Sequence, residues 1–160
     1  MTHKGPFAVA IDASENSKAA LDWAVKNLFP GSPQDACELI VFNCHTDTII
    51  PMRTRVFGGG AASTDKDYDE WHVTKTRLES QNLLKQAQQR VQELNPNCKV
   101  QLVSLVGDAR DALCDAVKEY KIECIVLGRT GTSKLERIML GAVSDYVLSH
   151  AGCTVILVKK

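Results

Sequence analysis

The sequence predicts an α/β fold, an open sheet of five parallel strands with helices on both faces. Apolar runs of strand length alternate along the chain with segments whose apolar residues recur at helical spacing. This order is typical of strand–helix–strand units joined by right-handed crossovers. The strand-like runs are continuously apolar, as expected for strands that are buried on both faces of a sheet. At 160 residues, the chain has the length of a single domain, 1–160.

The first strand and the first helix are expected at the N-terminal end. Residues 7–12 form a short apolar run that ends at Asp12, and Ser14 is a candidate N-cap for the helix that follows. Phe29-Pro30-Gly31 ends this helix. Its buried face consists of the apolar residues at helical spacing, which are Ala20, Leu21, Ala24, Val25 and Leu28.

A second strand, an irregular segment and a long helix follow. The strand covers residues 38–44, and His45 beside its end is expected to be a surface histidine. Residues 46–66 lack periodicity, which indicates a functional loop or a disordered segment. The helix runs from about 67 to 94, with an apolar face formed by Leu83, Leu84, Ala87, Val91 and Leu94.

The rest of the chain supplies three more strands and two more helices. The strands are expected at 98–106, 122–127 and 153–158. A helix led by Gly107-Asp108 lies between the first two, and a helix at 142–149 lies between the last two. All five strands then run in parallel, so their carboxyl ends meet at one edge, where such sheets bind ligands.

Three glycines after the fourth expected strand indicate a phosphate site. Gly128, Gly131 and Gly141 are spaced as G-x2-G-x9-G, and the last of them precedes a helix. Glycine lets backbone N–H groups approach an anion, and a helix N-terminus adds partial positive charge. The alternative is that the three glycines are only turn and cap residues of a strand–helix connection.

Several function classes are excluded by composition and missing motifs. The 19 Lys and Arg residues balance 19 Asp and Glu residues, so no net charge favours nucleic acid or a membrane surface. No apolar run reaches the length of a membrane span or a signal-peptide core, and we expect a cytoplasmic protein. The six cysteines form no C-x-x-C pair or zinc spacing, and we expect reduced thiols. Neither a Walker A motif nor G-x-G-x-x-G is present.

Three segments form a combination of motifs that resembles the universal stress protein family. They are V-A-I-D-A-S-E-N-S-K-A-A-L-D-W-A at 9–24, G-D-A-R-D-A-L-C-D-A at 107–116, and the glycine motif at 128–141. The likeness covers essentially the whole chain apart from the loop at 46–66. It implies a Rossmann-like fold of the adenine nucleotide alpha hydrolase-like kind that binds adenine nucleotide, usually as a homodimer. ATP is the common ligand where the glycine motif is kept.

The resemblance also implies which residues line the nucleotide. The phosphate and ribose side comprises Gly128, Arg129, Gly131, Gly141, Ala142, Val143 and Ser144. The adenosine side comprises Ala10, Ile11, Asp12 and Val41. Asp12 has two interpretations: it binds the ribose or a nucleotide-bound Mg²⁺, or it caps the following helix together with Ser14.

Ala142 is a departure from the family pattern, which usually has Ser or Thr directly after the last glycine. The backbone N–H at this position is retained, but one hydroxyl donor to phosphate is absent. A hydrogen bond to a charged group contributes about 1.5–3 kcal/mol. We therefore expect weaker triphosphate binding than the motif normally gives, partly compensated by Ser144.

The resemblance implies a protein of the stress response that binds ATP, or AMP or ADP, with Mg²⁺ accompanying the nucleotide. It acts as a nucleotide-dependent sensor or regulator with little catalysis, because no nucleophile–base pair follows from the motifs. One alternative is a slow ATPase or autophosphorylating protein, and another is a dimeric adaptor that no longer uses nucleotide. The apolar strand at 154–158, expected at the edge of the sheet, is the predicted homodimer contact.

Overall fold

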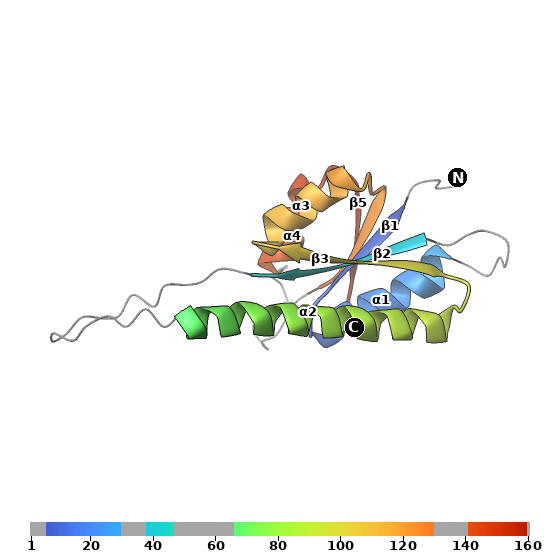
Figure 1. Ribbon diagram of the computed structural model, residues 1–160. Coiled ribbons are helices and arrows are strands. Elements are labelled where there is room, and N and C mark those ends of the chain that lie inside the picture. The colour runs from blue at the N-terminus through green and yellow to red at the C-terminus, as the bar shows by residue number, and fades with distance from the viewer. Residues whose placement is uncertain (1–5, 30–37, 47–65, 130–140, 160) are drawn as a thin grey trace, which may run out of the picture.

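The computed structural model describes residues 6–29, 38–46, 66–129 and 141–159, although no side-chain position is described for 66–70 or 72. Within these ranges, strands and helices alternate as the sequence predicts (Figure 1). The elements are β1 (Phe7–Ile11), α1 (Glu15–Leu28), β2 (Glu38–His45), α2 (Lys66–Leu94), β3 (Lys99–Val106), α3 (Ala109–Glu119), β4 (Cys124–Gly128), α4 (Ala142–His150) and β5 (Thr154–Val158).

The five strands form one parallel sheet in the order β3-β2-β1-β4-β5. β1 is central, and its Val9 is in register with Val41 of β2 and Val126 of β4. The chain builds the sheet from β1 outward through β2 to β3, and then returns to the other side of β1 to add β4 and β5. The strand order therefore reverses between β1 and β4, and such a reversal leaves a crevice at the carboxyl ends of the two strands.

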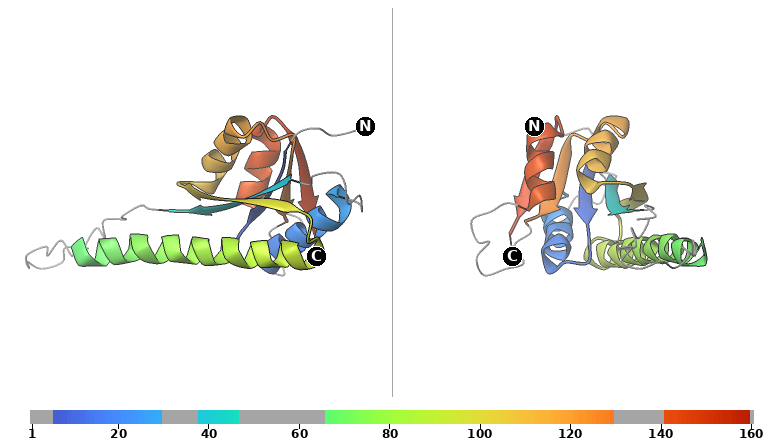
Figure 2. Two further views of the ribbon diagram at one scale, coloured as in Figure 1. Left: turned by 45° about the vertical axis from the view of Figure 1, so that its right-hand side comes forward. Right: turned by 90° about the vertical axis from the view of Figure 1, so that its left-hand side faces the viewer.

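Two helices cover each face of the sheet. Figure 2 shows α1 and α2 on one face and α3 and α4 on the other. Side chains alternate along β2: Val41 packs in the core beneath α1 and α2, while Phe42 packs in the core beneath α3 and α4. Both side chains are fully buried, which explains why the central strands are apolar without interruption. The predicted α/β class and parallel sheet are confirmed.

The expected surface position of His45 is wrong, because only 9% of this residue is exposed. β2 runs through His45, and the ring Nδ1 lies 3.1 Å from Ser104 Oγ on β3. Ser104 Oγ in turn lies 2.8 Å from Ser80 Oγ on α2. α2 extends past the carboxyl ends of β2 and β3 (Figures 1 and 2), so it covers the last residues of β2 that a shorter helix would leave open.

Residues 47–65, which include most of the irregular segment 46–66, lie outside the described residues. Among the helices in the described ranges, none combines the length and apolar character that a membrane crossing requires.

Candidate functional site

The turn between β1 and α1 brings Asp12 to the carboxyl edge of the sheet. Asp12 Oδ1 accepts a hydrogen bond of 2.8 Å from the Ser14 N–H, and Ser14 Oγ accepts one of 3.2 Å from the Ser17 N–H. Ser14 is therefore the N-cap of α1, as its sequence position predicts. Asp12 is exposed, and its Oδ2 has no hydrogen bond to another described residue. One carboxylate oxygen thus supports the turn while the other is available to a ligand.

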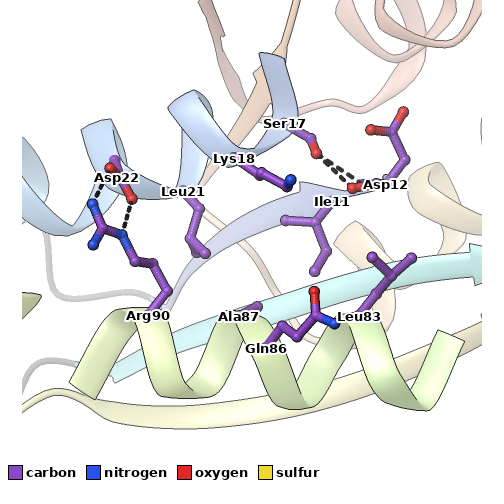
Figure 3. Close-up of a pocket in the computed structure, with 10 residues that line it drawn as sticks. All are labelled: Ile11, Asp12, Ser17, Lys18, Leu21, Asp22, Leu83, Gln86, Ala87 and Arg90. Carbon is purple, nitrogen blue, oxygen red and sulfur yellow. Dashed lines mark hydrogen bonds and ion pairs between the residues drawn. The ribbon is translucent and has the colours of Figure 1, made fainter. Parts of the chain in front are cut away.

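Ser17 fixes the backbone of this turn, a role that the sequence analysis missed. It is 4% exposed, and its hydroxyl accepts from the Asp12 N–H at 3.1 Å and lies 2.8 Å from the Asp12 carbonyl oxygen (Figure 3). The signal in the sequence is the spacing S-x-x-S from Ser14 to Ser17, since a serine three residues after an N-cap faces back toward it. Ser17 therefore positions Asp12 rather than offering its hydroxyl to a ligand.

Asn43 joins the ends of β1 and β2. It is 4% exposed and is in register with Ile11, whose carbonyl oxygen accepts a hydrogen bond of 2.7 Å from Asn43 Nδ2. The next residue, Cys44, is half-buried, and burial together with the nearby Asp108 carboxylate raises the pKa of its thiol to about 11. Cys44 is consequently a neutral thiol at physiological pH and a poor nucleophile.

Gly128 at the end of β4 lies against the first turn of α1. A Cβ at this position would lie 2.5 Å from the carbonyl carbon of Asn16 and 2.6 Å from the amide nitrogen of Ser17. The missing side chain therefore allows β4 and the α1 backbone to approach each other, and the anion contact expected from the glycine motif stays a prediction. Ala10 of β1 is in register with Leu127 of β4. Asp12 and Arg129 each come two residues later, directly after the ends of these neighbouring strands, so they lie at the same level of the sheet.

α4 begins beyond the last motif glycine. Gly141 is its N-cap residue. Because glycine has no side chain, the N–H groups of the first turn receive no capping hydrogen bond from this position. Ala142 is exposed, Val143 is half-buried and Ser144 is 3% exposed. The Ser144 hydroxyl donates a hydrogen bond of 3.0 Å to the Gly141 carbonyl oxygen. This hydroxyl is thus engaged within the helix and does not compensate for Ala142 in this conformation.

The other motif residues divide into three cases. Arg129 is half-buried, and its backbone N–H donates to the Val158 carbonyl oxygen at 2.8 Å. Gly131 lies outside the described residues. Val41 is 0% exposed and pairs in register with Val9 and Leu102 on both sides. Its side chain is in the core and its backbone is within the sheet, and its place beside the adenosine stays a prediction.

The charged groups at this edge are mostly paired. Asp108 is the N-cap of α3, and its carboxylate accepts two hydrogen bonds from the Arg110 guanidinium, at 2.9 and 2.8 Å. These bonds lower the pKa of Asp108 to about 2. In the described part of the chain, no three His, Cys, Asp or Glu side chains are grouped closely enough to hold a metal ion. A protein-bound metal centre has no support there, whereas Asp12 can offer one oxygen to a cation that arrives with a ligand.

Comparison with known proteins identifies relatives along nearly the whole chain. The model of the family described as "Universal stress protein family" matches residues 5–159. A universal stress protein of Synechocystis sp. is 29% identical over 161 residues, which cover 97% of this chain and 97% of the relative.

Solved structures of similar fold include proteins with bound nucleotides. A universal stress protein family protein from Arabidopsis thaliana, solved with AMP bound, is 17% identical with a TM-score of 0.64, covering 98% of this chain and 92% of that one. A universal stress protein solved with cAMP is 20% identical with a TM-score of 0.63, covering 96% of both chains. One from Archaeoglobus fulgidus, solved with dAMP, is 21% identical with a TM-score of 0.56, covering 97% and 98%.

Proposed function

Since the chain belongs to the universal stress protein family, we propose that it binds an adenine nucleotide (ATP, or AMP or ADP) at the carboxyl edge of the sheet, between β1 and β4. The main support is the reversal of strand order there, with Asp12 following β1 and Arg129 following β4 at the same level. Family members of this fold from other sources were solved with AMP, cAMP and dAMP. All three ligands share the adenine base and a phosphate.

Each part of the nucleotide has a proposed contact. The free oxygen of Asp12 would accept hydrogen bonds from ribose hydroxyls, or bind Mg²⁺ held by the phosphates. The first-turn N–H groups of α4, at Ala142 and Val143, would donate to phosphate oxygens with help from the helix dipole. Gly128, Arg129 and Gly131 would complete the phosphate side of the site, as the motif implies. Because Ala142 has no hydroxyl, we expect weaker binding of the phosphates than a Ser or Thr at this position would give.

We propose a regulatory rather than an enzymatic role for this binding. Two serine hydroxyls near the edge, those of Ser17 and Ser144, are already engaged by the protein's own backbone. The Cys44 thiol is kept neutral by burial. These groups are therefore poor candidates for a nucleophile, and bound nucleotide would act by stabilising one conformation or partner surface. The slow ATPase is the alternative, and phosphate release above background at saturating ATP would favour it.

Replacing Asp12 tests the proposed site directly. We expect Asp12→Ala to weaken ATP binding about tenfold, because it removes a charged acceptor for the ribose or for Mg²⁺. Isothermal titration of both proteins with ATP and Mg²⁺ measures the change. Asp115→Ala is the control, since Asp115 is an exposed carboxylate on α3 that forms an ion pair with Lys118 at 3.7 Å. Equal affinity of wild type and Asp12→Ala would place the ligand elsewhere.

A homodimer is the second part of the proposal. β5 is an outer strand of the sheet, and Val155, Ile156 and Leu157 in its centre are only half-buried. An apolar edge of this kind invites pairing with a second copy. We expect a dimer at micromolar concentration in sedimentation equilibrium, and dissociation when Ile156 is replaced by lysine. A monomeric wild-type protein under these conditions would contradict the proposed homodimer.

A further inference from the structure

Ser104 and His45 form a hydrogen-bonded pair that the proposed nucleotide binding does not use. Ser104 Oγ on β3 lies 3.1 Å from His45 Nδ1 on β2, although the two residues are 59 positions apart in the sequence. This distance is within the reach, about 2.6–3.2 Å, at which an imidazole takes the proton of a serine hydroxyl. The pair forms only because β2 and β3 lie side by side, so no sequence motif reveals it.

The surroundings of the pair suit a nucleophile and its base. Ser104 is exposed and can meet a substrate, whereas His45 is buried, so packing limits the orientations of its ring. α2 runs alongside β3 (Figures 1 and 2) and places Ser80 Oγ, which is buried, 2.8 Å from Ser104 Oγ. When Ser80 donates this hydrogen bond, the proton of Ser104 is directed to Nδ1 of His45. Ser80 is therefore a positioning residue for the pair.

Backbone donors lie beside the Ser104 hydroxyl. The Gly107 N–H donates to the His45 carbonyl oxygen at 2.9 Å, so it points from β3 toward β2. N–H groups alternate in direction along a strand, and those of Ser104 and Val106 therefore point to the opposite side. β3 is the outer strand on that side of the described sheet. These two N–H groups can donate to the oxygen of a carbonyl group that reacts at Ser104.

We propose that Ser104 and His45 hydrolyse carboxylic esters that carry a short acyl group. Ser104 Oγ attacks the carbonyl carbon while His45 Nδ1 takes the hydroxyl proton, and the backbone N–H groups stabilise the negative charge on the carbonyl oxygen. The bond to the alcohol then breaks, and the alcohol leaves with the proton from His45. Water hydrolyses the acyl-serine in the same way, which releases the carboxylic acid and restores Ser104.

Val106 determines the preference for a short acyl group. Its side chain lies on the same face of β3 as that of Ser104, because side chains two residues apart in a strand share a face. It is 55% exposed, and one valine beside the nucleophile covers only a few carbon atoms of a substrate. β2 separates β3 from β1 in the sheet, so this activity does not depend on the nucleotide binding proposed above.

Labelling with a fluorophosphonate tests the nucleophile. This reagent forms a bond between its phosphorus and an activated serine oxygen, and it releases fluoride together with the serine proton. We expect mass spectrometry to find the label on Ser104 of the wild type and none at this position in Ser104→Ala. Labelling of His45→Gln should be about a hundredfold slower, since a general base contributes about 10²–10⁴-fold. Ser149→Ala is the matched control and should label like the wild type, because the exposed Ser149 hydroxyl donates to the Asp145 carbonyl oxygen at 3.1 Å.

Hydrolysis of p-nitrophenyl esters tests the base and the acyl preference without a change at His45. The rate for p-nitrophenyl acetate should fall in acid, where a protonated imidazole no longer accepts a proton, and should drop to the buffer background in Ser104→Ala. The acetate should react faster than the decanoate. If circular dichroism shows that His45→Gln does not fold, this pH profile decides the role of the base. Absence of label on Ser104, unchanged labelling in a folded His45→Gln, or a rate of hydrolysis that Ser104→Ala retains would overturn the proposal.

Discussion

Gly128→Ala is expected to lower the free energy of unfolding by about 1–3 kcal/mol, and Gly128→Val by more. The new Cβ would lie 2.5 Å from the carbonyl carbon of Asn16 and 2.6 Å from its oxygen. Both atoms belong to the backbone of the first turn of α1, so no flexible side chain can move aside. β4 and α1 must separate instead, and the contacts between them are lost.

Urea denaturation of the three proteins measures this effect. The result that would contradict it is a stabilisation of about 0.4–1 kcal/mol by alanine, which is the usual outcome where a glycine occupies a conformation and a space that alanine tolerates. The first turn of α1 also positions Asp12, through Ser17. We therefore expect the same variants to weaken nucleotide binding, as an effect of the displaced turn rather than of a lost ligand contact.

Val41→Ala is expected to lower the free energy of unfolding by about 2–3 kcal/mol and to leave the affinity for ATP unchanged. Val41 is 0% exposed and belongs to the core beneath α1 and α2. Its truncation removes buried methyl groups and leaves a cavity between the sheet and the helices. The side chain lies in the middle of β2, between Val9 and Leu102, so no ligand at the carboxyl edge depends on it.

Val106→Ala is the matched control for this loss of stability. Val106 lies at the end of β3 and is 55% exposed, so its truncation should change the free energy of unfolding by no more than about 0.5 kcal/mol. A drop in ATP affinity for Val41→Ala, measured at a temperature where the variant is folded, would place Val41 at the nucleotide site and contradict this expectation.

The fold was predictable because its signals are local. The alternation of continuous apolar runs with helical periodicity predicts the order of all the described elements. The N-caps are local as well: Ser14 and Asp108 each lie just before a helix and accept a hydrogen bond from its first turn. Such features depend on residues that are close in sequence, so no knowledge of the sheet is needed.

The site was only partly predictable because it depends on contacts between distant segments. Asp12 follows from its place after a strand, but Asn43 bonds to Ile11 only because β2 lies beside β1 in one register. The contact of Gly128 with α1 requires β4 to lie next to β1. The motif also does not show how far β2 continues beyond Val41. The structure shows that β2 continues to His45.

The most direct test of nucleotide binding at the β1–β4 edge is a titration of the ¹⁵N-labelled protein with ATP and Mg²⁺, followed by ¹H–¹⁵N correlation NMR spectra. We predict saturable shifts of backbone amides at Asp12, Arg129 and Ala142, which come from three separate segments of the chain. Amides at the opposite, amino edge of the sheet, such as those of Phe7 and Lys99, should not move. An absence of shifts at millimolar ATP, or shifts confined to another surface, would contradict the proposal.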